Sequence, residues 1–217
     1  GTKQGFSIIK ATGSNSQNSF KHGLGKVPKF VIAKDIDNSR AWYIYHGSLG
    51  ANYRGSFDTA AFSSDSGYFG SGMTDTLVTL KSGGSGGNNY NGADMIYYVW
   101  ADVPGLQKFA TYTGNGNTDG PVVETGFSPR IVWTKAVSGS GGNWSIYDTT
   151  RSDHNVAPER LYPNTSSAEE SSAANMIDIL SNGFKLRHSN AQTNGNGITY
   201  IYCCLLYTSP SPRDQLQ

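Results

Sequence analysis

The sequence predicts an all-β fold made of two repeated, antiparallel β-sandwich-like units that pack together. Three observations support this prediction. Glycine supplies 27 of the 217 residues and aromatic residues make up 12%, a mixture typical of short strands joined by tight turns. Apolar and polar residues alternate over several short runs, which is the periodicity of strands. Similar blocks of sequence recur in the same order about a hundred residues apart, which indicates an internal repeat.

Five pairs of blocks define the repeat and place its strands. The blocks of the first copy are 5–13, 22–34, 42–46, 78–81 and 92–97, and their counterparts are 108–114, 125–135, 144–148, 184–187 and 197–202. The first block of each copy is an alternating strand that ends at Thr-Gly, the second is a turn followed by a buried strand, and the others are further short strands. The polar loops between the second and third blocks are typical of hairpin connections. We therefore predict one unit over residues 5–104 and a second over residues 105–202.

The third block of each copy indicates which side chains form the core. Residues two apart in a strand share a face, so Trp42 and Ile44 lie on one face of the strand. Tyr43 and Tyr45 lie on the opposite face, and residues 144–147 repeat the pattern. We predict that the Trp–Ile face is the core and that the tryptophan anchors each unit. A different pattern appears only at residues 166–180, where several alanines and a Glu-Glu pair predict a short helical excursion.

Charge and composition exclude several classes of protein. The net charge is +1, so nucleic acid is not an expected partner. No apolar run has the length that a membrane-spanning helix needs, so membrane insertion is not expected either. The two cysteines, Cys203 and Cys204, are adjacent and cannot form a disulfide framework. Because the chain begins without Met, we expect it to be part of a longer protein.

The carboxyl-terminal segment does not follow the alternating pattern of the strands. Residues 203–214 resemble the translation of a sequencing-library adapter, and a Pro-Ser-Pro segment interrupts the preceding strand. We therefore predict that residues 203–217 are an adapter-derived artefact and that the second unit ends at Tyr202.

The aligned blocks resemble an uncharacterised tandem-repeat β domain of tail fibre and other virion-associated proteins of tailed phages, many of them marine. The resemblance covers residues 5–202 and rests on residues 5–8, 22–25 with Pro28, 42–46 with Leu49-Gly50, 111–116 and 181–187. It implies a location in the virion, on the phage tail and extracellular when assembled. It also implies contacts with other virion tail proteins, and a homotrimer is possible.

The function that this resemblance implies is recognition of a bacterial surface glycan or protein receptor, without enzymatic activity. The first alternative is a purely structural fibre spacer or assembly module that has no ligand. A polysaccharide depolymerase is the second, and it would need two carboxylates that converge in a groove.

Sugar binding uses aromatic rings that stack on pyranose faces, together with amide and charged groups that bind hydroxyls. The predicted ligand-binding residues are Tyr43, Tyr45, His46, Tyr147, Asp148 and Arg151. The alternative is that these tyrosines form a second packed face or a subunit interface, which their exposure would decide.

No metal, cofactor or catalytic residue is predicted. His22 precedes a glycine-rich turn, but its counterpart is Thr125, and the histidines lack the spacing of zinc ligands. The segment 35–39 lacks the glycine and the distal glutamate of a calcium loop, so it is expected to be a solvated turn.

Overall fold

The computed structural model describes residues 4–57, 62–64, 68–70, 72–81, 87–138 and 142–206. In the first part of the chain the strands are β1 (Phe6–Thr12), β2 (Asn18–Lys21), β3 (Phe30–Asp35), β4 (Tyr43–His46), β5 (Tyr53–Ser56), β6 (Ser63–Ser64), β7 (Leu77–Leu80) and β8 (Asp94–Trp100). They are followed by β9 (Gln107–Thr113), β10 (Val122–Glu124), β11 (Ile131–Ala136), β12 (Ser145–Asp148), β13 (Glu159–Arg160), β14 (Glu170–Ser171), β15 (Ile177–Leu180), β16 (Gly183–Leu186) and β17 (Thr199–Leu205). The helical elements are the short 3₁₀ turn η1 (Ala173–Asn175) and α1 (Ala191–Asn194).

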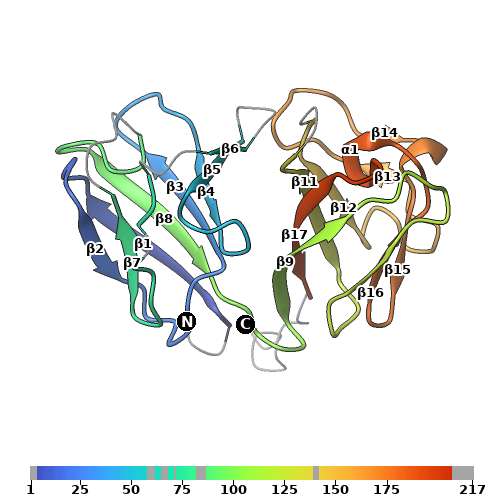
Figure 1. The fold of residues 1–217 in the computed structure, drawn as a ribbon, viewed down its shortest axis with the longest axis horizontal. Helices are drawn as coiled ribbons and strands as arrows, with labels where there is room; N and C mark the ends of the chain where they lie inside the picture. The colour runs from blue at the N-terminus through green and yellow to red at the C-terminus, as the bar shows by residue number, and fades with distance from the viewer. Residues whose placement is uncertain are drawn as a thin grey trace, which may run out of the picture.

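The strands form antiparallel sheets, which confirms the all-β prediction. In the first half of the chain, the sheet β1-β8-β3-β4-β5-β6 faces the pair β2-β7. The second half contains the sheets β12-β11-β17-β9 and β10-β16-β15 and the pair β13-β14. Figure 1 shows the two halves side by side, with β1 to β8 on the left and β9 to β17 on the right.

The two halves have the same arrangement of their main strands. The order β1-β8-β3-β4 in the first half matches β9-β17-β11-β12 in the second, and β2-β7 matches β10-β16. The registers agree as well, because Tyr97 pairs with Ile9 and Ala33, while Tyr202 occupies the same place between Ala110 and Thr134. These matches follow the predicted alignment of blocks. Duplication of one ancestral unit stays a prediction.

Individual contacts also recur at aligned positions. The ammonium group of Lys34 donates to the backbone oxygen of Arg40 at 2.6 Å, and that of Lys135 donates to the backbone oxygen of Gly142 at 2.7 Å. The Thr-Gly strand ends recur for a steric reason. A Cβ atom on Gly13 or on Gly114 would come within 3.0 Å of the backbone of a neighbouring loop, so only glycine permits this close approach.

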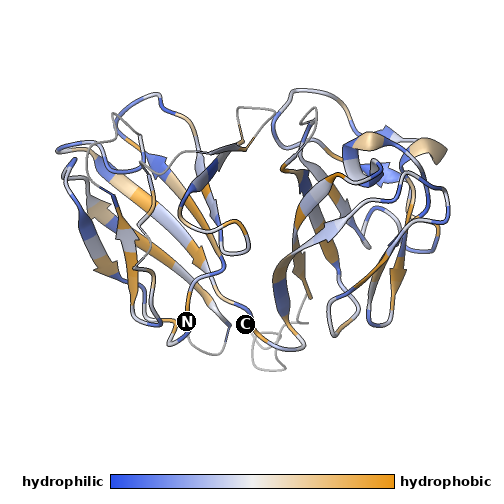
Figure 2. Cartoon of the chain, viewed as in Figure 1, coloured by the Kyte–Doolittle hydropathy of each residue, from blue (hydrophilic) through white to orange (hydrophobic). Residues whose placement is uncertain are grey.

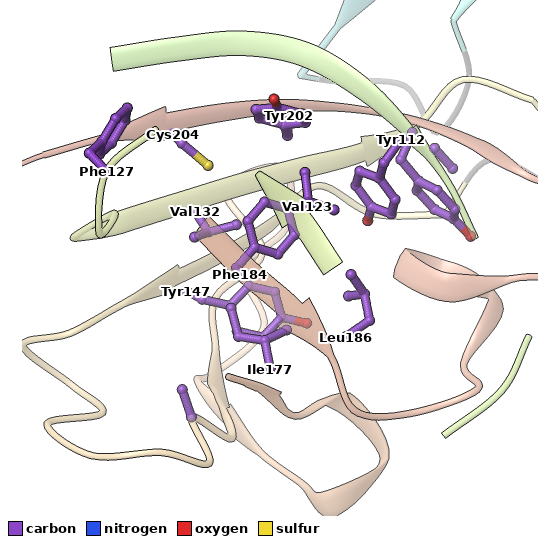
Figure 3. Close-up of a cluster of buried hydrophobic side chains, with 13 residues drawn as sticks. Tyr112, Val123, Phe127, Val132, Tyr147, Ile177, Phe184, Leu186, Tyr202 and Cys204 are labelled. Atoms are coloured by element: carbon purple, nitrogen blue, oxygen red, sulfur yellow. The ribbon is translucent and has the colours of Figure 1, made fainter. Parts of the chain in front are cut away.

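Each half has its own hydrophobic core, and the tyrosines of β4 and β12 belong to it. Tyr45 packs with residues of β7, and Tyr147 packs with Ile177 and Phe184 of the β15-β16 hairpin, as Figure 3 shows. Figure 2 shows that hydrophobic residues concentrate on the strands and that most loops are hydrophilic. The face that holds these tyrosines is therefore the core face within each half, which corrects the predicted assignment.

A third cluster of buried side chains joins the two halves. It contains Phe30 and Ile44 from the first half and Phe109 and Trp144 from the second. The rings of Phe30 and Phe109 are stacked with centroids 5.7 Å apart. The indole Nε1 of Trp144 donates to the backbone oxygen of Ser56 across the junction at 3.3 Å. The Trp–Ile face of the prediction is thus buried at the junction between the halves.

The anchoring role predicted for the two tryptophans is confirmed for one of them only. Trp144 is fully buried in the junction, whereas Trp42 has 38% of its surface exposed. Trp42 lies immediately before β4, at the margin of the region that the second half covers. Its ring therefore contacts Tyr98 and the Lys34 ammonium group on the outer surface of the first sheet.

The connection between the halves is a tight turn at the predicted unit boundary. The Gln107 side-chain amide donates to the backbone oxygens of Gly5 and Ala101 at 2.8 and 2.6 Å. The Asp102 carboxylate accepts from the Phe109 backbone nitrogen at 2.9 Å. These bonds hold the end of β8 and the start of β9 in one orientation.

The strand β17 runs past the predicted end of the second unit. Cys203 and Cys204 are buried and pair with both β9 and β11, and burial raises the pKa of both thiols well above its usual value. The fold of the second unit therefore includes residues 203–205, beyond the predicted boundary at Tyr202. The adapter origin of residues 203–217 stays a prediction, and residues 207–217 lie outside the described residues.

The helical excursion predicted for the segment 166–180 is limited to the three-residue 3₁₀ turn η1. The strands β14 and β15 lie on either side of this turn. Pairing of Glu170 with Arg160 and of Ile177 with Leu186 holds the chain in strands, so tertiary pairing overrides the local preference of the alanines. Among the helical elements of the described residues, none is long and apolar enough to cross a membrane.

Candidate binding groove

The three predicted tyrosines do not form an open aromatic surface. Tyr45 is 7% exposed and Tyr147 is 1% exposed. Tyr43 is half-buried against Tyr68, with ring centroids 4.8 Å apart, and the Arg54 guanidinium lies 5.5 Å from its ring. Because the second sheet of each half covers this face, stacking of a sugar on Tyr45 or Tyr147 is excluded and these site predictions are wrong.

His46 is buried at the junction and is not a surface ligand for a receptor. Its exposed fraction is 1%. The ring nitrogen Nδ1 accepts from the Ser48 backbone nitrogen at 3.3 Å, which leaves Nε2 to donate to the backbone oxygen of Tyr202 in the other half at 3.4 Å. Burial lowers the pKa of His46 to about 4, so the ring is neutral at physiological pH.

Asp148 and Arg151 are occupied in fixing the turn after β12. The Asp148 Oδ1 atom accepts from the backbone nitrogens of Thr150 and Arg151 at 3.0 and 2.9 Å. The Arg151 guanidinium pairs with Asp148 Oδ2 at 2.6 Å and with Glu169 at 3.0 Å. Partial burial raises the pKa of Asp148, but the hydrogen bonds and charge of Arg151 outweigh this effect and hold the pKa below its usual value. His46 and Asp148 thus cap equivalent turns, and the structure does not unite the predicted residues in one site.

Acid is expected to destabilise the protein through His46. Its folded-state pKa of about 4 lies below the 6.5 of the exposed ring, so the unfolded chain binds the proton more tightly. The contribution of His46 to the free energy of unfolding is therefore fully present above about pH 7. As the pH falls from about 6.5 towards 4, this contribution decreases by about 2 to 3 kcal/mol. Urea titrations monitored by tryptophan fluorescence at pH 7, 6, 5 and 4.5 measure the decrease.

The variant His46→Asn is the control for this prediction. Its amide oxygen can accept from the Ser48 backbone nitrogen, as Asp148 accepts from that of Thr150, but it does not titrate. We expect a shallower pH dependence in the variant. Some dependence remains, because burial and the charge of Arg160 also lower the pKa of His188 to about 4. An unchanged slope in the variant would show that the His46 ring does not carry the effect.

A different part of the molecule offers an open aromatic groove. It has a volume of about 790 Å³ and is lined by Trp42, Phe57, Trp133, Ile146, Pro163, Asn164, Thr165 and Ser166. The first half contributes the residues next to β4 and β5, and the second half contributes β11, β12 and the segment that follows β13. This volume is within the range of ligand-binding sites, roughly 300 to 1,000 Å³.

The aromatic part of this groove is held rigidly by the junction. The rings of Phe57 and Trp133 are stacked with centroids 5.2 Å apart and an interplanar angle of 3°. Both also contact the buried ring of Trp144, at 5.0 and 5.4 Å. Together with the exposed ring of Trp42, these residues present preformed aromatic surface, and binding on such a surface costs little conformational entropy.

The polar side of the groove is a tight turn. The Asn164 side chain accepts from the Trp144 backbone nitrogen and donates to the Asn143 side chain, both at 2.9 Å. The Thr165 backbone nitrogen donates to the Tyr162 backbone oxygen at 3.2 Å. The Thr165 hydroxyl also takes part in the turn, because it donates to the Tyr162 backbone oxygen at 3.5 Å and accepts from the Ser167 backbone nitrogen at 3.2 Å. Both Thr165 and Ser166 are exposed residues.

A smaller hollow adjoins the groove at Trp42. It has a volume of about 450 Å³ and is lined by Lys34, Asp35, Ile36, Asp37, Asn38, Ser39, Trp42, Ile96 and Tyr98. Its loop is rigid because the buried Asp35 carboxylate accepts from the backbone nitrogens of Asp37 and Asn38 at 3.0 and 2.9 Å. The segment predicted to be a solvated turn is thus a turn with a buried cap.

The two hollows differ in the carboxylates of their described lining. The residues that line the larger groove, within the described part of the chain, include no Asp or Glu. In the smaller hollow the Asp35 carboxylate is bound by the loop backbone and by Arg40 at 3.2 Å. Asp37 is the other carboxylate of the smaller hollow, and it accepts from the Asp94 backbone nitrogen at 2.7 Å.

A metal site is not apparent in the described residues. Within them, no group of three or more His, Cys, Asp or Glu side chains is placed to hold an ion. The loop 115–120 has alternating Asn, Asn and Asp followed by Gly, which resembles a calcium loop in spacing. In the structure the Asn194 amide nitrogen lies 3.2 Å from the Asn115 side-chain oxygen and 2.8 Å from the Asn117 backbone oxygen, and Asp119 pairs with Lys185 at 2.6 Å. The oxygens of this loop that would bind an ion are therefore already hydrogen-bonded to the Asn194 amide or paired with the Lys185 ammonium group.

Phe57, Trp133 and the turn at 163–166 were not among the predicted site residues. Trp133 lies in a block predicted to be a buried strand, and the turn has a typical Pro-Asn-Thr-Ser composition. No local signal connects them, because their proximity depends on how the two halves pack.

Comparison with known proteins gave one match. A family model described as a domain of unknown function (DUF7483) matches residues 1–208. No curated protein and no solved structure matches the chain. The matched region includes both halves and the whole of β17.

Proposed function

We propose that this chain, which belongs to the DUF7483 domain family, is a recognition module that binds a glycan in the groove at Trp42. The observation that carries the proposal is an exposed tryptophan beside a rigid floor of stacked aromatic rings. Trp42 is the only tryptophan of the described residues that is among the exposed large hydrophobic side chains.

The composition of the groove supports a carbohydrate ligand. A pyranose ring has apolar faces that stack on aromatic rings and a rim of hydroxyl groups that form hydrogen bonds. The groove combines the rings of Trp42 and Trp133 with the hydroxyl groups of Thr165 and Ser166 on its other side. Both kinds of contact are thus available to one ligand.

The resemblance to phage tail fibre domains suggests where this recognition takes place. On that basis the ligand is a bacterial surface glycan, and the module belongs to the tail of a virion, next to other tail proteins. A protein receptor is the less favoured partner, because the turn at 163–166 offers hydroxyl and amide groups and no described charged residue lines the larger groove.

Trp42→Ala is expected to weaken glycan binding about tenfold or more, because an exposed ring that supplies stacking area is removed. Binding is measured on a glycan array and then by calorimetry with the best ligand. Tyr53→Ala is the matched control, since Tyr53 is an exposed aromatic residue that lines neither hollow. Equal affinities of the Trp42→Ala variant and the wild type would refute the groove as the binding site.

A structural role is the second candidate, and burial of Tyr45 and Tyr147 favours it. In this case the ring of Trp42 is covered by a neighbouring subunit in the assembled protein. Acrylamide quenching of tryptophan fluorescence distinguishes the two functions. Quenching that falls as the protein oligomerises supports the spacer, and quenching that falls only when a glycan is added supports recognition.

A further inference from the structure

The larger groove and the smaller hollow share one residue. Trp42 lines both of them. Its ring lies nearly parallel to that of Tyr98, with centroids 6.4 Å apart and an interplanar angle of 26°. Two aromatic platforms therefore follow one another along the outer surface of the first sheet, with Trp42 between the two hollows.

The smaller hollow has charged residues in its described lining, which the larger groove lacks. Asp37, Asn38 and Ser39 are exposed on its loop. The Asp37 carboxylate is held in place because it accepts from the Asp94 backbone nitrogen at 2.7 Å. The Lys34 ammonium group lies 5.7 Å from the centroid of the Trp42 ring, in the geometry of a cation–π contact. The hollow thus places fixed hydrogen-bonding groups next to an aromatic face.

Each hollow is large enough to hold a ligand of its own. The volumes of about 790 and 450 Å³ both lie in the range of small-molecule sites, roughly 300 to 1,000 Å³. A single sugar that stacks on Trp42 from one side leaves the other hollow empty. A chain of sugars can occupy both.

We infer that the two hollows are subsites of one groove and that the ligand is an oligosaccharide of at least two sugars that passes over Trp42. A neutral sugar lies between Trp133 and the turn at 163–166, and the next sugar lies on Tyr98 with its hydroxyl groups at Asp37 and Ser39. This inference rests on the proposed glycan-binding function and extends it to the length of the ligand.

The variant Ser39→Trp tests the second subsite. Ser39 is exposed and lines the smaller hollow only, so the new ring obstructs that hollow and leaves the larger groove open. Ser181→Trp is the matched control, because Ser181 is an exposed residue of the turn between β15 and β16 and lines neither hollow. The probes are oligomers of one to six units of β-1,4-linked glucose, β-1,4-linked N-acetylglucosamine and α-linked mannose, with affinities measured by calorimetry.

We expect the affinity of the wild type to rise about tenfold or more from one unit to three, and the Ser39→Trp variant to lose this gain while its affinity for the single sugar is unchanged. If short and long oligomers bind the wild type equally, or if Ser39→Trp binds the long ones like the Ser181→Trp control, the extended groove is wrong although the proposed function stands. If the wild type binds no oligomer of any series, both are wrong.

Discussion

A chain truncated after Tyr202 is expected to lose the folded state of its second half. The strand β17 is central, between β9 and β11, and truncation removes its last three residues. The buried side chains of Cys203 and Cys204 are lost from two clusters, and the Arg130 backbone nitrogen loses its acceptor on Leu205. Removal of buried side chains and ladder hydrogen bonds together costs about 5 kcal/mol or more, which is comparable to the entire stability of a typical domain.

Circular dichroism and urea unfolding measure this effect. Truncation after Thr208, the last residue matched by the family model, is the control and is expected to keep the stability of the full chain, because every ladder residue of β17 remains. If truncation after Tyr202 leaves the unfolding midpoint unchanged, residues 203–205 do not contribute to the stability of the fold.

Trp144→Ala is expected to destabilise the protein by about 3 to 5 kcal/mol, the usual cost of removing a buried large aromatic side chain. The indole is fully buried between the rings of Phe57, Phe62 and Trp133. It also donates the hydrogen bond to Ser56 that connects the halves. Because the same ring supports the floor of the groove, the variant is also expected to lose glycan binding at temperatures where it is still folded.

Two further variants separate packing from hydrogen bonding. Trp144→Phe retains much of the volume and loses the bond to Ser56, so a smaller cost of about 1 to 2 kcal/mol is expected. Trp42→Ala changes the aligned residue of the first half, but its cost is expected to be below about 1 kcal/mol because the ring is exposed. Free energies of unfolding from urea titrations show whether the cost decreases in the order Trp144→Ala, Trp144→Phe, Trp42→Ala. Equal costs for Trp42→Ala and Trp144→Ala would contradict the assigned environments.

The positions of the strands and the pairs of equivalent residues were predictable from the sequence because they depend on local signals. The Thr-Gly strand ends, the turns before β3 and β11 and the alternation in β8 are visible within short windows of sequence. Even the equivalence of His46 and Asp148, which cap corresponding turns, follows from the alignment. The role assigned to these two residues was wrong because a polar side chain after a strand can cap its own turn as readily as it can face a ligand.

Aromatic rings beside amide and charged groups were predicted from the sequence. The groove has the aromatic rings and the amide of Asn164, but its described lining has no charged residue, and its place was not predicted. Trp42 was assigned to the core, and the tyrosines next to it were assigned to the surface. In the structure Tyr45 is buried and Trp42 is exposed. The groove also needs Trp133 and the turn at 163–166, which are distant from Trp42 in sequence.

Alternation along a strand determines which residues share a face, and the sequence alone establishes this alternation. Which face meets solvent is a different question whenever both faces carry apolar residues, as they do in β4 and β12. The answer depends on what packs against each face: the second sheet of each half covers the tyrosines, and the other half of the chain covers Ile44 and Trp144. Only the tertiary structure decided it, because burial is set by contacts between segments about a hundred residues apart and not by the pattern within one strand.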